Sequence, residues 1–391
     1  MSNMKVTKDM SDNIKAAAIL ANFYLNKRDR LLEAHPTDHD KVVFKGSNLI
    51  PLKIGDNWFF CDTDVNISTA TDLDTGTVEA GKDYYVYACD NNGSLEFKIS
   101  LNSTYPDGFN ANNSRKIGGF HTLCADVGSI TDHPLSGYVA ADILPASVWD
   151  LKHRPRCSPE GMVYSEKAGI WVDIYLQSGT GSNTASVYGG TITDSRNWMD
   201  FVDDLAAVGK QLLSDAEFQI IAQGSNEETN ISDSADPVTT GGHSDTAGRR
   251  MISNIGCEDC CGAMWQWLRD QSYRLDGQSH THTQTITHKE TATGSAIYKD
   301  QAESTPNAVL GSGADETITG NATDPTPSWS WYNLPGGKGS LYRQGSYGDI
   351  KLLAGGPWAN GTHCGSRSRG AGDFRWNASS YVGGRGRSEP L

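Results

Sequence analysis

Residues 355–387 read GGPWANGTHCGSRSRGAGDFRWNASSYVGGRGR, and this stretch says most about the fold. Bulky or charged side chains alternate there with small, polar and aromatic ones. Such alternation is expected where a rigid framework presents exchangeable contact side chains. A glycine-rich subdomain that merely closes the fold is the alternative interpretation. The residues that we interpret as framework are Trp358, Arg367, Trp376 and Arg385.

Four landmarks in the second half come in a fixed order. They are GKQLLSDAEFQIIAQG (209–224), GAMWQW (262–267), AGGPW (354–358), and GSRSR (365–369) followed by YVGGRGR (381–387). Each motif alone is weak, but the ordered set is specific. It resembles the branch of the C-type lectin fold that formylglycine-generating proteins share with the variable proteins of diversity-generating retroelements.

The first half of the chain shows which family within this branch the sequence resembles. The segments EAGKDYYVYACDNNG, NSRKIGGFH, SVWDLKHRPRCSPEGM and GIWVDIYL are similar to the phage major tropism determinant family. The resemblance covers residues 41–391. It implies a homotrimer at the virion tail-fibre tip, made in the host cytoplasm, with tail-fibre proteins and a bacterial surface protein or glycan receptor as partners. The first forty residues depart from the family, which begins with an intertwined β-prism.

The resemblance also implies a set of variable positions. In that family, diversification changes adenine-containing codons near the end of the gene and leaves a scaffold between them. An ungapped placement from the GGRG match gives twelve receptor-contact residues, all reachable by mutating the adenines of an AAC or AAT codon. They are Pro357, Ala359, Asn360, Gly361, His363, Gly370, Gly372, Asp373, Asn377, Ser379, Tyr381 and Val382.

Hydrophobic patterning predicts an α+β chain, with a C-terminal C-type-lectin-like domain preceded by a β-sandwich and an N-terminal helix. The helix is expected over 11–33, either as an oligomer seam or docked on its own chain. Short alternating runs separated by DNNGS-like turns predict the β-sandwich. The expected domains are 1–40 for oligomerisation or attachment, 41–150 for the β-sandwich, and 151–391 for the variable domain.

The second half mixes elements. It contains a strand at GIWVDIYL and helices at WMDFVDDLAAVG and SDAEFQIIAQ. Segments 223–250 and 276–327 are poor in apolar residues, so we expect surface loops there.

Net charge and hydropathy exclude some partners. The formal net charge of −14 disfavours binding to nucleic acid, which needs clustered Lys and Arg. No run of eighteen apolar residues and no apolar leader at the N-terminus is present, so we expect no membrane insertion. The charge is uneven: residues 334–391 carry +5 and the remainder −19.

Cysteine and histidine clusters raise the question of metal binding. Cys257, Cys260 and Cys261 form half of a common zinc site, but no second CxxC follows. An iron site on a threefold axis could use His280, His282 and His288, and the loop ADPVTTGGHSDTAGR could hold calcium. Core packing, one disulfide and solvated loops are the interpretations that we favour. We predict no metal, no cofactor and mostly free thiols.

Two other functions compete with phage receptor binding. A formylglycine-generating oxidase needs reactive thiolates paired near the C-terminus, whereas only Cys364 follows Cys261 here. A cellular surface lectin diversified by a retroelement would share every motif above. We predict binding alone and no enzymatic activity.

Overall fold

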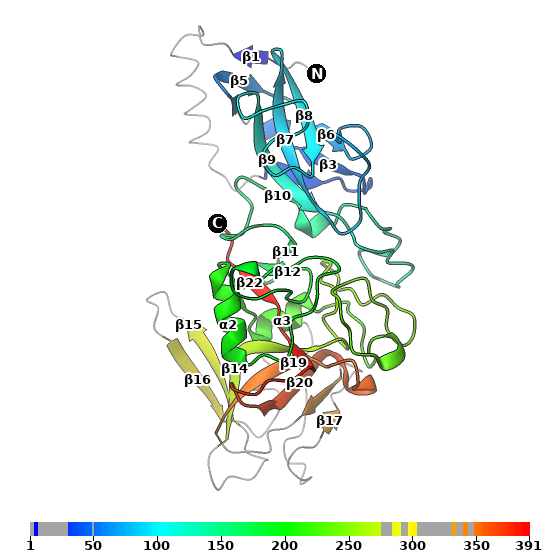
Figure 1. The fold of residues 1–391 in the computed structure, drawn as a ribbon, viewed down its shortest axis with the longest axis vertical. Coiled ribbons are helices and arrows are strands. Elements are labelled where there is room, and N and C mark those ends of the chain that lie inside the picture. The colour runs from blue at the N-terminus through cyan, green and yellow to red at the C-terminus, as the bar shows by residue number, and fades with distance from the viewer. Residues whose placement is uncertain are drawn as a thin grey trace. The chain divides into compact units, whose positions relative to one another are not determined.

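The computed structural model describes residues 4–6, 30–48, 51–274, 284–290, 296–302, 331–333, 339–342 and 348–391. The described chain is mostly β, with several antiparallel pairings and two short α-helices (Figure 1). The predicted α+β class is therefore confirmed only in part, because both helices and strands are present but strands dominate. Within the described residues, no helix is both long and apolar enough to cross a membrane.

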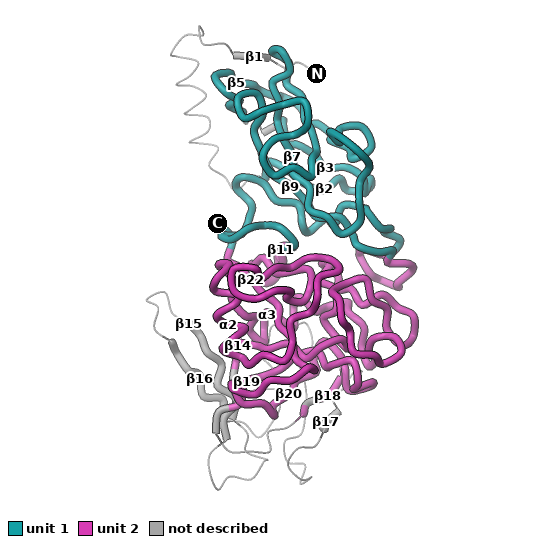
Figure 2. Tube along the Cα trace, viewed as in Figure 1, with its two compact units in different colours: residues 1–126, 137–163, 390–391 teal, residues 127–136, 164–389 magenta. Residues whose placement is uncertain are grey.

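Two compact units divide the chain (Figure 2). Unit 1 comprises Met1–Asp126, Gly137–Val163 and Pro390–Leu391. Unit 2 comprises Val127–Ser136 and Tyr164–Glu389. The three-part division made from the sequence stays a prediction.

Unit 1 contains three sheets. Their strand orders are β2-β3-β6, β10-β9-β7-β8 and β1-β5-β4. The bounds are β1 Met4–Val6, β2 Leu32–Ala34, β3 Lys41–Phe44, β4 Leu52–Ile54, β5 Asn57–Phe60, β6 Val65–Ser68, β7 Asp83–Asn91, β8 Ser94–Ser100, β9 Ser114–His121 and β10 Trp149–Asp150.

The hairpin between β7 and β8 follows from its turn sequence. Asn92 and Gly93 both have positive φ, 51° and 95°, which the two-residue turns that match strand twist require. Asn and Gly tolerate this conformation better than other residues do. The DNNGS turn predicted from the sequence lies at this hairpin.

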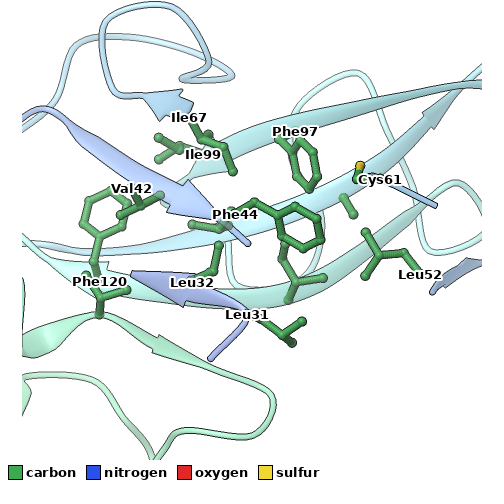
Figure 3. Close-up of a cluster of buried hydrophobic side chains, with 14 of the residues drawn as sticks. Leu31, Leu32, Val42, Phe44, Leu52, Cys61, Ile67, Phe97, Ile99 and Phe120 are labelled. Carbon is green, nitrogen blue, oxygen red and sulfur yellow. The ribbon is translucent and has the colours of Figure 1, made fainter. Parts of the chain in front are cut away.

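Apolar side chains from these sheets form one core cluster (Figure 3). Phe44 of β3 packs against Phe97 of β8, with ring centroids 4.7 Å apart and planes inclined by 36°. Leu31 and Leu32 are also buried in this cluster, and their backbone N–H groups donate to Asp150 Oδ2 at 2.7 and 3.2 Å.

The expected helix over 11–33 is therefore wrong at its C-terminal end. Residues 32–34 pair with β3 as a strand. Burial of Leu31 and Leu32, and the hydrogen bonds from their backbone N–H groups to Asp150, favour extended backbone over a helical turn. Residues 11–29 of the expected helix lie outside the described residues.

Unit 2 is built on two sheets. Their orders are β11-β12-β22-β13 and β16-β15-β14-β19-β20-β18-β17, and β21 pairs parallel with β14. The bounds are β11 Met162–Ser165, β12 Ile170–Asp173, β13 Gln211–Leu212, β14 Trp265–Arg274, β15 Gln284–Glu290, β16 Ala296–Ala302, β17 Trp331–Asn333, β18 Ser340–Tyr342, β19 Gly348–Gly355, β20 Gly365–Asp373, β21 Val382–Gly383 and β22 Gly386–Ser388.

Both predicted helices of unit 2 are confirmed. Helix α2 spans Trp198–Ala207 and helix α3 spans Asp215–Ile221. Each begins with a capping box, Asn197 with Asp200 and Ser214 with Glu217, in which side chain and backbone satisfy each other reciprocally. The described 3-10 turns include η1 Gly46–Asn48, η2 Pro145–Ser147, η3 Gly181–Asn183, η4 Ser232–Ser234 and η7 Gly361–His363.

Residues 223–250 are not a surface insertion, contrary to the prediction. They form little regular structure, but Asn230, Thr240 and Asp245 are buried. Hydrogen bonds make this burial tolerable: Asp245 accepts from the Thr229 hydroxyl at 2.7 Å and from backbone N–H groups at 2.9 Å. Most of 276–327 lies outside the described residues.

Candidate functional site

Arg385 is the most deeply connected residue of the C-terminal stretch. Its guanidinium is buried and donates to Gln266 Oε1 at 3.0 Å, to the carbonyls of Asp173 and Ile174 at 2.7 and 2.5 Å, and to the carbonyl of Glu258. Four acceptors from residues 173–174, 258 and 266 are thereby fixed to one planar group. Arg385 is a structural centre rather than a free cation.

The glycines around Arg385 let the chain pass close to its neighbours. A Cβ on Gly384 would lie 2.5 Å from the Phe201 ring of α2, and one on Gly386 would lie 2.5 Å from Asp173 Oδ2. Both distances are shorter than a real Cβ contact. The GGRGR motif is therefore required by packing.

Two further arginines of β20 are tied to helix α3. Arg369 Nε donates to Asp215 Oδ1, and its guanidinium lies 5.2 Å from the centre of the Phe218 ring. Arg367 donates to Gln219 Oε1, and Gln219 in turn donates to Asp215 Oδ2 at 2.8 Å. We call Arg367, Arg369 and Arg385 the framework arginines.

A second carboxylate lies behind Asp215. Asp270 of β14 accepts the Asp215 backbone N–H at 2.5 Å. Burial raises the pKa of Asp270 to about 7, and the negative charge of Asp215 adds to the rise. This corner of the framework thus holds a carboxyl group that is protonated under mildly acidic conditions.

Half of the Lys and Arg side chains counted in residues 334–391 are buried arginines. They are Arg367, Arg369, Arg385 and Arg387. Arg387 Nε lies 3.7 Å from Glu217 Oε1, and its Nη1 donates to Glu389. Much of this positive charge is therefore held in the interior of the described structure.

The irregular segment 223–250 supports the same stretch from another direction. Glu227 accepts the Ser366 backbone N–H at 2.9 Å and also the Ser366 hydroxyl. Asn230 donates to the carbonyl of Trp358. A polar segment that reads as a loop therefore holds β20 and the turn before η7 in place.

Residues 374–381, which we call the display loop, carry the more accessible side chains. Trp376 is 62% exposed and stacks on Phe374, with ring centroids 4.9 Å apart and planes inclined by 4°. Tyr381 is 39% exposed and stacks on Trp358 at 4.9 Å and 12°. Backbone bonds anchor the loop, from Trp198 N to Arg375 O and from Ser195 N to Ser379 O, both 3.1 Å.

The twelve predicted contact residues fall into groups of different accessibility. The exposed ones are Ala359 and Tyr381. The half-buried ones are Asn360, Gly361, His363, Gly372, Asp373, Asn377 and Ser379. The buried ones are Pro357, Gly370 and Val382.

The three buried positions do not fit a role in contact. Val382 packs with Trp265 and Leu353 in an interior cluster. A Cβ on Gly370 would lie 3.3 Å from the Leu353 Cβ, and Pro357 forms a bridge with Ala263. We leave these three residues out of the contact surface.

The four predicted framework residues also differ in their exposure to solvent. Arg367 and Arg385 are buried, and Trp358 is half-buried against the cluster around Met264. Trp376, by contrast, is exposed in the display loop. Its side chain can therefore make contacts that an interior residue cannot.

The thiols near this stretch are buried, and none of the eight cysteines forms a disulfide. Burial raises the pKa of Cys364 to about 12. Burial would also raise the pKa of Cys260, but the Cys257 thiol and the Arg385 guanidinium hold it below its ordinary value. Cys364 is thus a poor nucleophile at neutral pH.

No group of three or more His, Cys, Asp or Glu side chains in the described part of the chain is arranged to hold a metal ion. Cys257, Cys260 and Cys261 are buried beside β14, where the sequence suggested packing or zinc. The side chains of His280, His282 and His288 lie outside what the structure describes.

Known proteins share parts of this sequence and its fold. A sequence profile for the Mtd second domain matches residues 36–150. The tail fiber receptor-binding protein of Bordetella phage BPP-1 is 28% identical over 227 residues, a match that covers 52% of this chain and 58% of that protein. The chain is a distant homologue of the major tropism determinants.

Solved tropism determinants share the fold along nearly the whole chain. The U1 and I1 variants superpose with a TM-score of 0.63 at 22% and 24% identity, and each match covers 94% of this chain and 85% of the other. The resemblance seen in the sequence is confirmed. The names of these relatives refer to receptor binding and tropism, not to catalysis.

Sequence reasoning missed part of the framework around the C-terminal stretch. Arg369, Asp215 and Glu227 were not singled out, although Arg369 belongs to the GSRSR motif and Asp215 to the α3 start. The available signal was the pairing of an arginine-rich strand with an acidic helix start in one ordered motif set. Glu227 had no such signal, because it lies in a polar stretch of loop composition.

Proposed function

We propose that this protein is a phage tail-fibre receptor-binding protein that determines host tropism. The observation that carries the proposal is the division within residues 355–387. Buried arginines lock β20 and β22 to distant elements, while the display loop and the turn at η7 leave small, polar and aromatic side chains accessible. Such a division suits a surface whose contacts change while its fold stays constant.

The finer fold and assembly belong to the same proposal. Unit 2 is a C-type-lectin-like domain of the branch shared with formylglycine-generating proteins, and unit 1 is a β-sandwich. The protein forms a homotrimer at the virion tail-fibre tip, and a retroelement diversifies its last segment. The relatedness to a tail fiber receptor-binding protein supports these assignments.

The mechanism is binding without chemistry or cofactor. The contact surface comprises Ala359, Asn360, Gly361, His363, Gly372, Asp373, Asn377, Ser379 and Tyr381. Tyr provides a large contact area at little entropy cost, and Asn adapts its hydrogen bonds to different partners. Three copies on one fibre, repeated over several fibres, compensate for a modest affinity at each site. The receptor is a bacterial surface protein or glycan.

A direct test replaces accessible contact residues together. The variant N360S/H363S/N377S/Y381S of the full chain, fluorescently labelled, is compared with wild type for binding to intact cells of a panel of bacterial strains that includes Bordetella. We expect loss of the binding shown by wild type, with a melting temperature lower by only a few degrees. A matched control, N112S/N183S/Y188S, changes exposed residues elsewhere and should bind as wild type does.

Four outcomes would contradict the proposal. Unchanged cell binding by the contact variant would place the receptor site elsewhere, and a collapse of its melting temperature would make these residues core. Oxidation of a cysteine peptide by the purified protein would favour the formylglycine-type oxidase. A gene neighbourhood with a reverse transcriptase but without tail genes would favour the cellular surface lectin.

A further inference from the structure

A cleft in unit 1 is formed by residues that take no part in the proposed contact surface. It has a volume of about 340 Å³ and is lined by residues 74–75, 100–102 and 105–109. Binding pockets for small molecules commonly begin at about 300 Å³. At roughly 30 Å³ for each water-sized atom, this cleft holds about one sugar ring.

One part of the cleft lining is apolar and accessible. Tyr105 is 41% exposed and Leu101 is 45% exposed, although both are large hydrophobic residues. Phe109 lies half-buried beside them in the lining. An aromatic ring next to aliphatic carbon provides a flat surface on which the C–H face of a ligand can pack.

The polar part of the lining offers both acceptors and donors. Asp74 Oδ2 accepts the Asp107 backbone N–H at 2.7 Å, whereas Asp74 Oδ1 and the Asp107 carboxylate accept no hydrogen bond within the described residues. Asn102 Oδ1 accepts from Thr104 N and Oγ1 at 3.1 and 2.7 Å. The two N–H bonds of the Asn102 amide are therefore left for a partner other than Thr104.

Hydrogen bonds fix the backbone of this lining before any ligand arrives. The Tyr87 hydroxyl donates to the Asn102 carbonyl at 2.6 Å, and Asn102 N donates to Ser100 Oγ at 2.9 Å. The Phe109 backbone N–H donates to the Pro106 carbonyl at 3.1 Å. A lining held in this way loses little conformational entropy on binding.

We propose that this cleft binds a neutral saccharide unit. A hydroxyl group both donates and accepts, so a sugar can bond the carboxylates of Asp74 and Asp107 and the amide of Asn102 at once, while its C–H face packs on Tyr105. A phosphate or carboxylate ligand would be repelled by the two aspartates. An organic ammonium would match the aspartates but leave the Asn102 donors without an acceptor.

The test is ligand-observed NMR on the full-chain protein with methyl glycosides of glucose, galactose, mannose, rhamnose and N-acetylglucosamine. A single ring in a shallow site is expected to bind with a Kd of about 1 mM, so each probe is used up to about 10 mM. At least one glycoside should bind. Tyr105→Ala should weaken that binding by about threefold to tenfold, and Asp107→Asn should weaken it as well.

Matched controls separate this site from the rest of the molecule. Tyr188→Ala removes a tyrosine of similar exposure, 43%, from unit 2, and Asp62→Asn removes an exposed aspartate elsewhere in unit 1. Both should bind the sugar as wild type does. The proposal is overturned if no glycoside binds, if Tyr105→Ala binds as well as wild type, or if choline binds at this cleft in place of every sugar. The result is independent of cell binding through unit 2.

Discussion

The framework arginines and the display loop are close in sequence but opposite in physical character. Arg367, Arg369 and Arg385 are long charged side chains that are buried and hydrogen-bonded to distant elements. Trp376, an aromatic residue, is largely exposed in the loop between them. Residue type alone is therefore a poor guide to burial here, because partners from distant elements decide which side chains the interior accepts.

Breaking the framework at its centre should have the largest effect. Arg385→Ala would leave the Gln266 side chain and the carbonyls of Asp173, Ile174 and Glu258 buried without their donor. We expect the free energy of unfolding to fall by about 3 to 5 kcal/mol, measured by urea denaturation. Arg375→Ala, in the display loop, should cost less than about 1 kcal/mol. An equal fall in the free energy of unfolding in the two variants would show that the framework and the display loop contribute equally to stability.

Asp270 makes the framework sensitive to pH. Its pKa is raised to about 7 in the folded chain, against an ordinary value of 3.8. Its contribution to stability is therefore complete below about pH 4 and is lost as the pH rises through 7.

Asp270→Asn should remove this dependence. Its melting temperature should rise relative to wild type between pH 4 and 8, by the equivalent of about 2 to 4 kcal/mol. Asp203→Asn on the exposed face of α2 should follow the wild-type curve throughout. A constant offset between Asp270→Asn and wild type would show that the Asp270 carboxyl is ionised across this range.

Replacement of Trp376 tests whether the display loop contributes to binding rather than to stability. If its indole contacts the receptor, Trp376→Ala should weaken cell binding by about thirtyfold or more, as for a central aromatic anchor. The free energy of unfolding should change by less than about 1 kcal/mol, since the side chain is exposed and loses mainly its stacking on Phe374. A large loss of stability with intact cell binding would show that Trp376 is a framework residue, as we predicted from the sequence.

The smallest effect is expected at Tyr381. Removing its ring in Tyr381→Ala eliminates the stack on Trp358 and should lower the free energy of unfolding by about 0.5 to 1.5 kcal/mol. Tyr381→Phe keeps the ring and should be as stable as wild type, so any change in cell binding would report on the hydroxyl group alone.

Local signals predicted local structure well. The segments WMDFVDDLAAVG and SDAEFQIIAQ were predicted as helices and contain α2 and α3, and the DNNGS turn lies at the β7–β8 hairpin. Features that depend on distant partners were not predictable in this way. The end of the expected N-terminal helix became strand because Asp150 binds the amides of Leu31 and Leu32 across more than a hundred residues.

The same distinction explains the result for the candidate site. Motif order suggested where the framework lies, and Arg367 and Arg385, which we interpreted as framework residues, are buried. Spacing alone could not tell that Val382 enters a parallel pairing with β14 or that Gly370 faces Leu353. Segment 223–250 was mistaken for surface because its burial depends on hydrogen bonds rather than on apolar residues.

The placement of β22 within its sheet has a consequence for synthesis. Residues 386–388 pair with both β12 and β13, and Pro390 bridges back to Pro155. The ribosome must therefore synthesise the chain as far as residue 388 before this sheet can close, and until then β12 and β13 lack the strand that pairs with both of them. A product truncated before residue 386 would keep these strand edges unpaired, which makes it prone to aggregation and proteolysis.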